Sequence, residues 1–576
     1  MKYTYKALLI LGLSAMLGQT IISCGSKLPE SRVDTTKSAK EPKSDSKDSS
    51  KEIESKPASA PLPHTTAQRN NAPAKAKTEG MAAESAKKIG ADKGDVSEDK
   101  KPTGEGYDLI SENPFYSVIE NPLSTFSIDV DTASYSNVRR FINEGQLPPK
   151  DAVRLEEMIN YFSYEYPQSK DEKPFSVNTE ISESPWNPSH KLVQIGLQGK
   201  RISTENLPPN NLVFLIDVSG SMDEENKLPL IKSSLRLLVN ELRAKDKVSI
   251  VVYAGNAGLV LPATPGNQKE QILNAIDKLD AGGSTAGGEG IQLAYKIAKD
   301  NFIKSGNNRI ILATDGDFNV GVASDSELVS LIEKQRDQGI FLTILGVGMG
   351  NLQDAKMEKL ADKGNGNYAY IDSLMEAKKV LVKQMGGTLL TIAKDVKIQV
   401  EFNPRLVQGY RLIGYENRLL AKQDFNDDKK DAGEIGAGHQ VTALYEIIPV
   451  GVKSDVSLSK VDDLKYQQPQ TKNTAYNSNE LMQVKLRYKQ PNQNNSQLVT
   501  IPITNKEVKL QNASTNFKFA ASVAAFGMVL RDSKYKGTAN FDQVLNLARQ
   551  SQGTDLDGYR AEFIRLVDKS KTLKGL

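Results

Sequence analysis

The most constraining feature of this sequence is a central stretch in which short, continuously apolar runs alternate with segments of helical periodicity. Leu212 to Ile216 is the first such run, and Leu228 to Leu242 is the first segment with apolar residues at helical spacing. A continuous apolar run is typical of a strand buried on both faces. The alternation predicts an α/β fold with a doubly wound, mostly parallel sheet. Further strands are expected at 248–253, 310–313, 340–347 and 368–370, and further helices at 272–279, 291–302, 328–338, 352–361 and 373–385.

Polar residues follow these expected strands at the edge where sheets of this kind bind ligands. The first strand leads into Asp217, Ser219 and Ser221, and the strand at 310–313 leads into Asp315. A glycine-rich loop with Thr285 lies between them. All five side chains offer oxygen, which favours a hard cation: Mg²⁺ first, with Mn²⁺ or Ca²⁺ as alternatives.

These three segments resemble the metal-ion-dependent adhesion site of von Willebrand factor A (VWA) domains, which have a Rossmann-like fold. The resemblance covers about residues 207–386. It implies that the hydroxyls of Ser219, Ser221 and Thr285 coordinate the ion. It also implies that Asp217 and Asp315 bind the ion directly or through water. An acidic side chain of a protein partner would then complete the coordination.

A simpler reading is that these side chains only cap helices, since Ser221 stands just before the acidic run 223–225. The two readings are compatible. No catalytic residues are predicted: the glycines at 346, 348 and 350 do not complete a dinucleotide fingerprint, because Asn351 stands where the third glycine belongs. A Ser-His-Asp triad would have to recruit His190 or His439 from outside the central stretch. We therefore expect a protein that is not an enzyme.

The N-terminus reads as an export signal, residues 1–24. Lys2 and Lys6 precede an apolar stretch from Ala7 to Leu17, which is too short to span a bilayer. The following Ile-Ile-Ser-Cys, ending at Cys24, resembles a bacterial lipobox, which implies lipidation of Cys24 and a membrane anchor. An ordinary signal peptide is the alternative. By resemblance to enterobacterial sorting, Gly25 favours the outer membrane of the bacterial cell envelope; periplasmic or surface exposure stays open.

Residues 25–106 are rich in Lys, Ser, Ala, Pro and acidic residues and contain no aromatic residue, so we expect a disordered tether. Cys24 is the one cysteine among 576 residues, which excludes intramolecular disulfides and a thiolate zinc site. The formal net charge of +3 gives no reason to expect nucleic acid as a partner.

The flanks of the central stretch are an N-terminal α+β extension, 107–206, and a β-rich C-terminal domain, 387–576, that ends in helices. Alternating residues predict strands at 175–181, 193–197, 396–402, 441–447 and 482–488. A strand is expected at 126–131, and helices at 132–143, 150–161, 519–530, 541–549 and 559–567. Asp131 or Thr132 is expected to cap a helix, and Trp186 to anchor a core. We hypothesise that strands from both flanks form one β-sandwich into which the VWA domain (207–386) is inserted.

The order of lipobox, tether, extension, VWA domain and long C-terminal region resembles the YfbK-like bacterial VWA lipoproteins. It implies a membrane-anchored, cation-dependent protein-binding module of the cell envelope, with an adhesion or scaffold role. Two alternatives stay open. One is a structural envelope component whose metal site is stabilising or vestigial; the other is a metal-assisted hydrolase, against which the lack of a base in the three motif segments speaks.

Overall fold

The computed structural model describes residues 104–254, 256–282, 287–316, 324–384, 390–456, 458 and 478–576. Cys24, Thr285, the predicted signal peptide and nearly all of the predicted tether therefore lie outside the described residues. In the described part of the chain, no helix combines the length and the hydrophobicity needed to cross a membrane.

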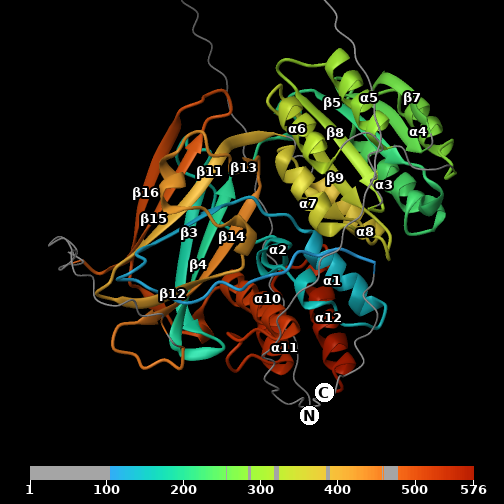
Figure 1. Cartoon of the computed structure of the whole chain (residues 1–576). Coiled ribbons are helices and arrows are strands. Elements are labelled where there is room, and N and C mark those ends of the chain that lie inside the picture. Colours follow the sequence, from blue (N-terminus) through green and yellow to red (C-terminus); the bar gives the residue numbers. More distant parts are fainter. Residues whose placement is uncertain are drawn as a thin grey trace, which may run out of the picture. The chain divides into compact units, whose positions relative to one another are not determined.

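The central stretch forms a six-stranded sheet in the order β10-β9-β8-β5-β6-β7 (Figure 1). Neighbouring strands run parallel except β6 and β7, which are antiparallel. The expected doubly wound α/β fold is thus confirmed. Edge strand β7 was not expected, because Gly258 and Pro262 weaken its strand signal; both residue types are tolerated at an edge. The strands are β5 (Asn210–Asp217), β6 (Lys247–Ala254), β7 (Asn256–Pro265), β8 (Asn307–Thr314), β9 (Ile340–Gly346) and β10 (Tyr368–Tyr370).

Helices cover both faces of this sheet. Along β5, Phe214 packs into a core shared with α3, α4 and α8, whereas its neighbours Val213 and Leu215 pack into a core shared with α5, α6 and α7. This alternation explains why the run is apolar at every position. The helices are α3 (Leu228–Glu241), α4 (Lys269–Asp277), α5 (Gly287–Asp300), α6 (Asp325–Arg336), α7 (Asp354–Lys363) and α8 (Leu374–Lys378), which continues as a π-helical segment, η4 (Lys379–Gln384).

Two further sheets are built from strands of both flanks. One has the order β1-β12-β14-β4-β3-β17; in the other, β11 pairs with β13, β15 and β2, and β15 pairs with β16. The first comprises β1 (Tyr116–Ser117), β3 (Phe175–Ser184), β4 (Asn187–Gly199), β12 (Val407–Ile413), β14 (Gln440–Pro449) and β17 (Glu507–Val508). The second comprises β2 (Leu123–Ser127), β11 (Thr391–Phe402), β13 (Gly433–Gly436), β15 (Glu480–Lys489) and β16 (Ser496–Thr504).

The hypothesis of a shared β-sandwich is confirmed by strand pairing. β4, before the central stretch, pairs antiparallel with β14, after it, with Ile195 opposite Ala443. β2 pairs with β11 in the same way, with Phe126 opposite Ile398. All four residues belong to one apolar core between the two sheets. The central stretch is therefore an insertion in a sandwich that neither flank could form alone.

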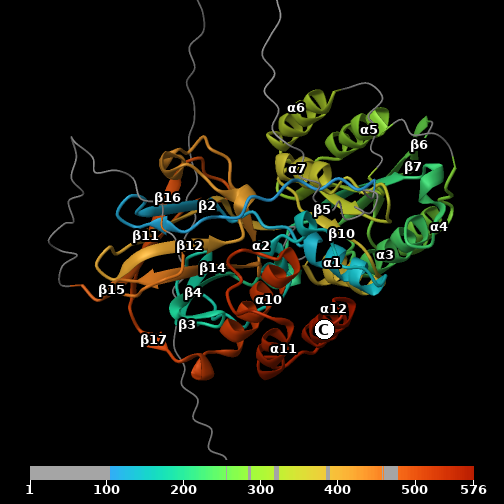
Figure 2. The ribbon, with the colours of Figure 1, turned by 60° about the horizontal axis from the view of Figure 1, so that its bottom comes forward.

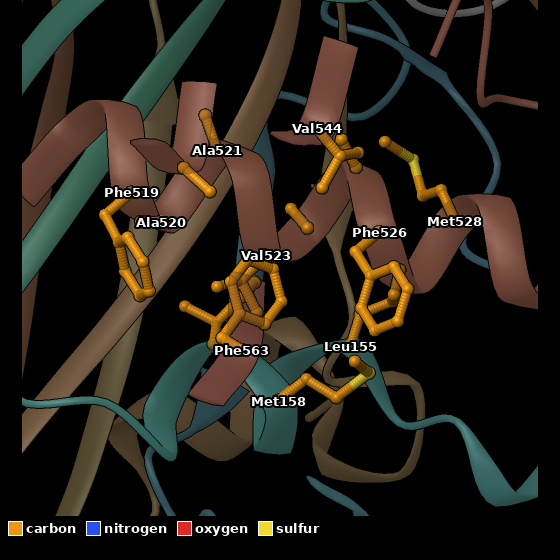
Figure 3. Close-up of a cluster of buried hydrophobic side chains, with 14 of the residues drawn as sticks. Leu155, Met158, Phe519, Ala520, Ala521, Val523, Phe526, Met528, Val544 and Phe563 are labelled. Carbon is orange, nitrogen blue, oxygen red and sulfur yellow. The ribbon is translucent and has the colours of Figure 1, made fainter. Parts of the chain in front are cut away.

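A helical layer covers a further large apolar core. Helix α10 is apolar on all sides, as expected for a helix buried all round. It packs against α2, α11 and α12, and α1 joins the same core through α2 and α12 (Figure 2); Phe526, Phe563 and Met158 lie near its centre (Figure 3). These helices are α1 (Ala133–Asn143), α2 (Leu155–Asn160), α10 (Thr515–Arg531), α11 (Phe541–Gln550) and α12 (Tyr559–Leu573). Single 3₁₀ turns are η1 (Lys150–Ala152), η2 (Thr204–Asn206), η5 (Glu416–Arg418), η6 (Lys422–Asn426) and η8 (Leu510–Asn512).

The strand expected at 126–131 ends already at Ser127. Two further local predictions are wrong. The helix expected at 150–161 is interrupted at Arg154, whose backbone is extended and donates its N–H to Ser134 Oγ at 2.9 Å. The expected cap of α1 is also absent, since Thr132 makes no side-chain cap bond. Asp131 instead accepts the N–H of Tyr368 at 2.8 Å, which ties the N-terminal extension to β10. In both places a contact with a distant segment replaces the local one.

Candidate cation site

The candidate site lies at the carboxyl edge of the central sheet, where β5 and β8 end. Asp217 is the last residue of β5, and Asp315 directly follows the last residue of β8. The two strands are parallel neighbours with Ile216 opposite Ala313, so Asp217 is level with Thr314 and Asp315 lies one residue beyond. Both side chains are fully buried. Strand order and register thus bring together two carboxylates that are far apart in sequence.

Asp217 organises the site through bonds to three segments. Its Oδ1 accepts the N–H of Ser219 at 2.9 Å. Its Oδ2 accepts the hydroxyls of Tyr253, at the end of β6, and Thr314, each at 3.1 Å. Burial raises the pKa of Asp217, and the charge of Asp315 adds to this, while the Ser219 bonds lower it. The carboxylate thereby holds the loop after β5 against β6 and β8.

The two motif serines converge. Ser219 Oγ and Ser221 Oγ are 3.0 Å apart; Ser219 is buried and Ser221 faces solvent. The backbone between them forms a 3₁₀ turn, η3 (Gly220–Asp223), anchored by the buried side chain of Met222. Ser219 at the start of this turn makes no side-chain cap bond. The capping explanation therefore fails for Ser219, and its hydroxyl points to its partner serine.

A lysine connects Asp315 to the loop that carries Ser219 and Ser221, called the serine loop below. Lys227 Nζ lies 3.2 Å from Asp315 Oδ2 and donates to the carbonyl oxygen of Ser221 at 2.8 Å. The next residue, Gly316, has a φ of +110°, and a side chain there would collide with the backbone of Asn351 and Gln353. The chain can therefore turn sharply after Asp315, which keeps this carboxylate at the sheet edge.

Thr285, the fifth predicted ligand, lies outside the described residues. The start of its loop is described: the N–H of Gly282 donates to the carbonyl oxygen of Val218 at 2.8 Å. After the loop, α5 packs so closely on the sheet that a side chain at Gly290 would lie 2.6 Å from Tyr253 Cβ. The loop that carries Thr285 therefore begins beside the serine motif, and the role of Thr285 stays a prediction.

The described donors fit a hard cation. They are two carboxylates and two hydroxyls, the oxygen ligands that Mg²⁺ prefers. Ser219 Oγ and Ser221 Oγ are hydrogen-bonded at 3.0 Å, and this separation also matches the spacing of about 3.0 Å between neighbouring oxygens in an octahedral shell of about 2.1 Å radius. Among the described residues, no three His, Cys, Asp or Glu side chains form a metal-holding group. An ion at this edge would accordingly depend on the serine hydroxyls.

Sequence reasoning missed three contributors to this site: Tyr253, Thr314 and Lys227. Tyr253 and Thr314 could have been found, because both stand at carboxyl ends of predicted strands. The sequence did not indicate that Lys227 belongs to the site, because a lysine just before a helix is usually exposed to solvent. Its contacts with Ser221 and Asp315 depend on how α3 packs beside the sheet.

Residues 104–106 lie beside this site. Gly106 donates its N–H to Leu352 at 2.9 Å, and Gly350 donates its N–H to Glu105 Oε1 at 2.9 Å. Glu105 in turn forms an ion pair with Arg140 of α1 at 2.8 Å. Residues 104–106, assigned above to the tether, are therefore bonded to the loop that packs against Gly316.

A separate cavity of about 240 Å³ lies near the opposite end of the sheet. Its wall includes Arg309 of β8 and Asp362 of α7, together with Arg418, Glu434 and His439 from the sandwich segments. Burial raises the pKa of Glu434 to about 7 and lowers that of His439 to about 4. Asn365 donates to Glu434 at 3.0 Å across this junction, and Arg418 ion-pairs with Asp362. These polar contacts join the inserted stretch to the sandwich.

Three family models match this chain. The model described as von Willebrand factor type A domain matches residues 211–384, the stretch that forms the central sheet. A model described as von Willebrand factor matches residues 101–194. The model described as uncharacterized protein YfbK, C-terminal, matches residues 387–573. Together the three cover nearly all of the described chain.

Curated relatives agree with these matches. The uncharacterized protein YfbK of Escherichia coli K12 is 47% identical over 470 residues, which are 80% of this chain and 80% of that protein. The inter-alpha-trypsin inhibitor heavy chain H3 of Bos taurus is 27% identical over 260 residues, 42% of this chain and 28% of that one. Among solved structures, a von Willebrand factor type A protein from Catenulispora acidiphila is 16% identical, with a TM-score of 0.38, over 69% of this chain and 91% of that one.

Proposed function

Since this chain belongs to the YfbK-like family of von Willebrand factor A proteins, we propose that the carboxyl edge of its central sheet binds a protein partner through a divalent cation. The family relationship points to a protein-interaction module. The observation that carries the cation is the convergence of Ser219 Oγ and Ser221 Oγ, 3.0 Å apart, beside two buried aspartates. Mg²⁺ is the first candidate, and Mn²⁺ and Ca²⁺ share its preference for oxygen.

Each side chain has a distinct part in this proposal. Ser219, Ser221 and Thr285 supply neutral hydroxyl ligands, and Asp315 supplies charge. Asp217 accepts hydrogen bonds from Ser219, Tyr253 and Thr314, so its main part is to orient the serine loop.

Bound there, the ion would supply an electrophilic position for an acidic side chain of the partner. Three neutral hydroxyls and two carboxylates do not over-neutralise a divalent ion, so it can still bind a carboxylate. Exposed Ser221 lies where a partner can reach the ion.

The proposal includes a place in the cell. Lipidation of Cys24 would anchor the protein to the bacterial envelope, with the outer membrane favoured, and no nucleic acid takes part. This part is supported by the N-terminal sequence alone.

A structural envelope component with a stabilising or vestigial ion site is the competing function. A hydrolase is less well supported. His190 is engaged by Glu446 and Ser454 in the sandwich, at 2.7 and 2.8 Å, rather than at the sheet edge.

The test is calorimetric titration with MgCl₂ and a Mg²⁺-dependent pull-down from envelope extract. It compares the wild type with the double variant Ser219→Ala, Ser221→Ala. Serine to alanine removes two hydroxyls with little change in packing. Ser233→Ala on α3 is the matched control, because its hydroxyl bonds only a carbonyl oxygen of its own helix.

We expect the double variant to lose both Mg²⁺ and partner binding, and the control to keep both. Partner capture that persists in EDTA would refute the ion bridge. Mg²⁺ binding without any Mg²⁺-dependent partner would favour the structural alternative.

A further inference from the structure

Lys227 is a buried lysine at the candidate cation site. It immediately precedes α3, and its side chain is only 4% exposed. Its ammonium donates to Ser221 O at 2.8 Å, lies 3.2 Å from Asp315 Oδ2 and forms an ion pair with Glu224 Oε1 at 3.3 Å. One positive charge therefore sits between the serine loop and Asp315.

The fold makes room for this side chain. Position 348, in the loop after β9, is a glycine with a φ of +75°. A Cβ there would come within 2.4 Å of Lys227 Cε and within 3.0 Å of two further carbons of the same side chain. The aliphatic part of the Lys227 side chain thus packs between α3 and the loop after β9, and this packing fixes the position of its ammonium group.

We infer that Lys227 is a built-in counter-ion of the cation site, which lowers the affinity of that site for divalent cations and stabilises the site when it holds no ion. This inference rests on the proposed function. Asp217 and Asp315 bring two negative charges to a buried edge, and Lys227 compensates one of them in place. Burying unpaired charges is costly, so the ion-free protein gains from the lysine.

The same charge acts against a bound ion. A divalent cation on Asp315 would share this carboxylate with the ammonium, and like charges that close repel each other strongly when they are shielded from water. Glu224, whose side chain is 61% exposed, offers the ammonium a second partner at the surface. Removing the lysine charge is therefore expected to have opposite effects: tighter ion binding and a less stable ion-free protein. A lysine that only fills space would not link these two quantities in this way.

The experiment compares the wild type with Lys227→Met, which keeps the length of the side chain and removes its charge. Lys296→Met is the control, because it makes the same substitution at an exposed position of α5 in the same domain. Calorimetric titration with MgCl₂ gives Kd, and thermal melts in EDTA and in saturating MgCl₂ give Tm. For Lys227→Met we expect Kd to fall at least tenfold, Tm in EDTA to fall, and Mg²⁺ to restore most of that loss. Lys296→Met should match the wild type in all three measurements.

The outcomes separate this inference from the proposed function. If the wild type and Lys227→Met bind Mg²⁺ equally well, or the variant binds it more weakly, the counter-ion role is wrong and the cation site stands. If neither the wild type nor Lys227→Met binds Mg²⁺, both the counter-ion inference and the proposed cation site are wrong. If Lys227→Met does not fold, Lys227→Gln replaces it, because its amide can still donate to Ser221 O, and the same criteria apply.

Discussion

The ammonium nitrogen of Lys379 lies 3.0 Å from the centre of the Tyr161 ring. This lysine belongs to the π-helical segment that follows α8, and it is buried. Among the described residues, its Nζ has no hydrogen-bond partner. Burial lowers its pKa to about 7; the charge of Glu376 opposes this shift, and that of Arg139 adds to it.

We predict that Lys379→Met stabilises the protein, and more so at low pH. Because the pKa in the folded state is below the ordinary value near 10.5, the cost of burying the charge is fully present below pH 7. It disappears as pH rises from 7 to 10.5. The substitution should raise the free energy of unfolding by about 1–3 kcal/mol at pH 6 and by clearly less at pH 9.

Urea unfolding at the two pH values measures this difference. Lys383→Met, in the same π-helical segment but more exposed and paired with Asp557, is the control and should change stability little at either pH. An equal gain at both pH values would show that the buried charge is not the source of the gain, and a loss would show that the cation–π contact outweighs burial.

Arg154 should be far more important for stability than a surface arginine. Its guanidinium contacts Glu157 at 2.5 Å and also bonds Asp354 of α7, and all three side chains are at most 7% exposed. Arg154→Met leaves buried carboxylates without their cation, so we expect a loss of about 3–5 kcal/mol. Arg236→Met breaks an ion pair with Asp277 whose side chains are about half exposed, and should cost about 0–1 kcal/mol. Denaturant midpoints compare the two variants; similar losses would mean that the buried cluster contributes no more than a surface pair.

Gly527 of α10 packs tightly against α2. A Cβ at this position would lie 2.3 Å from Leu155 Cδ2 in the core of Figure 3. We predict that Gly527→Ala destabilises the protein by about 1–3 kcal/mol despite the better helix propensity of alanine. Gly258→Ala is the control, because a Cβ there meets only Val252 at an ordinary 3.8 Å. Thermal melting distinguishes them, and a stabilised Gly527→Ala would show that the two helices can separate without cost.

Cys24 carries the predicted anchor. Cys24→Ser should move the protein from the membrane fraction to the soluble fraction of the cell, because the lipid attachment site is lost. Fractionation with immunoblotting measures the shift, and mass spectrometry of the wild type should find lipid on Cys24 as the first residue. Ser23→Ala keeps a small residue before the cysteine and should behave as the wild type. A wild type without lipid would favour the ordinary signal peptide.

Local patterns were sufficient to predict the parallel strands of the central sheet, β5, β6, β8, β9 and β10. The run from Leu212 to Ile216 has to be buried on both faces, because it offers no polar side for water. The positions of Asp217 and Asp315 follow from this, because each stands at the end of such a run and parallel strands have their carboxyl ends at the same edge of the sheet. Where local signals were weak, prediction failed, as at the edge strand with Pro262.

Sequence by itself therefore determined the α/β class of the central stretch, the ends of its strands and the oxygen-bearing side chains of the candidate site. Only the tertiary structure decided which strands pair across the insertion, as Ile195 and Ala443 do, because alternation shows a strand's buried face and not its neighbour. It also decided that Lys227 meets Asp315. That contact depends on the packing of a helix against a distant loop. The periodicity of side chains along the sequence does not predict which distant elements come into contact.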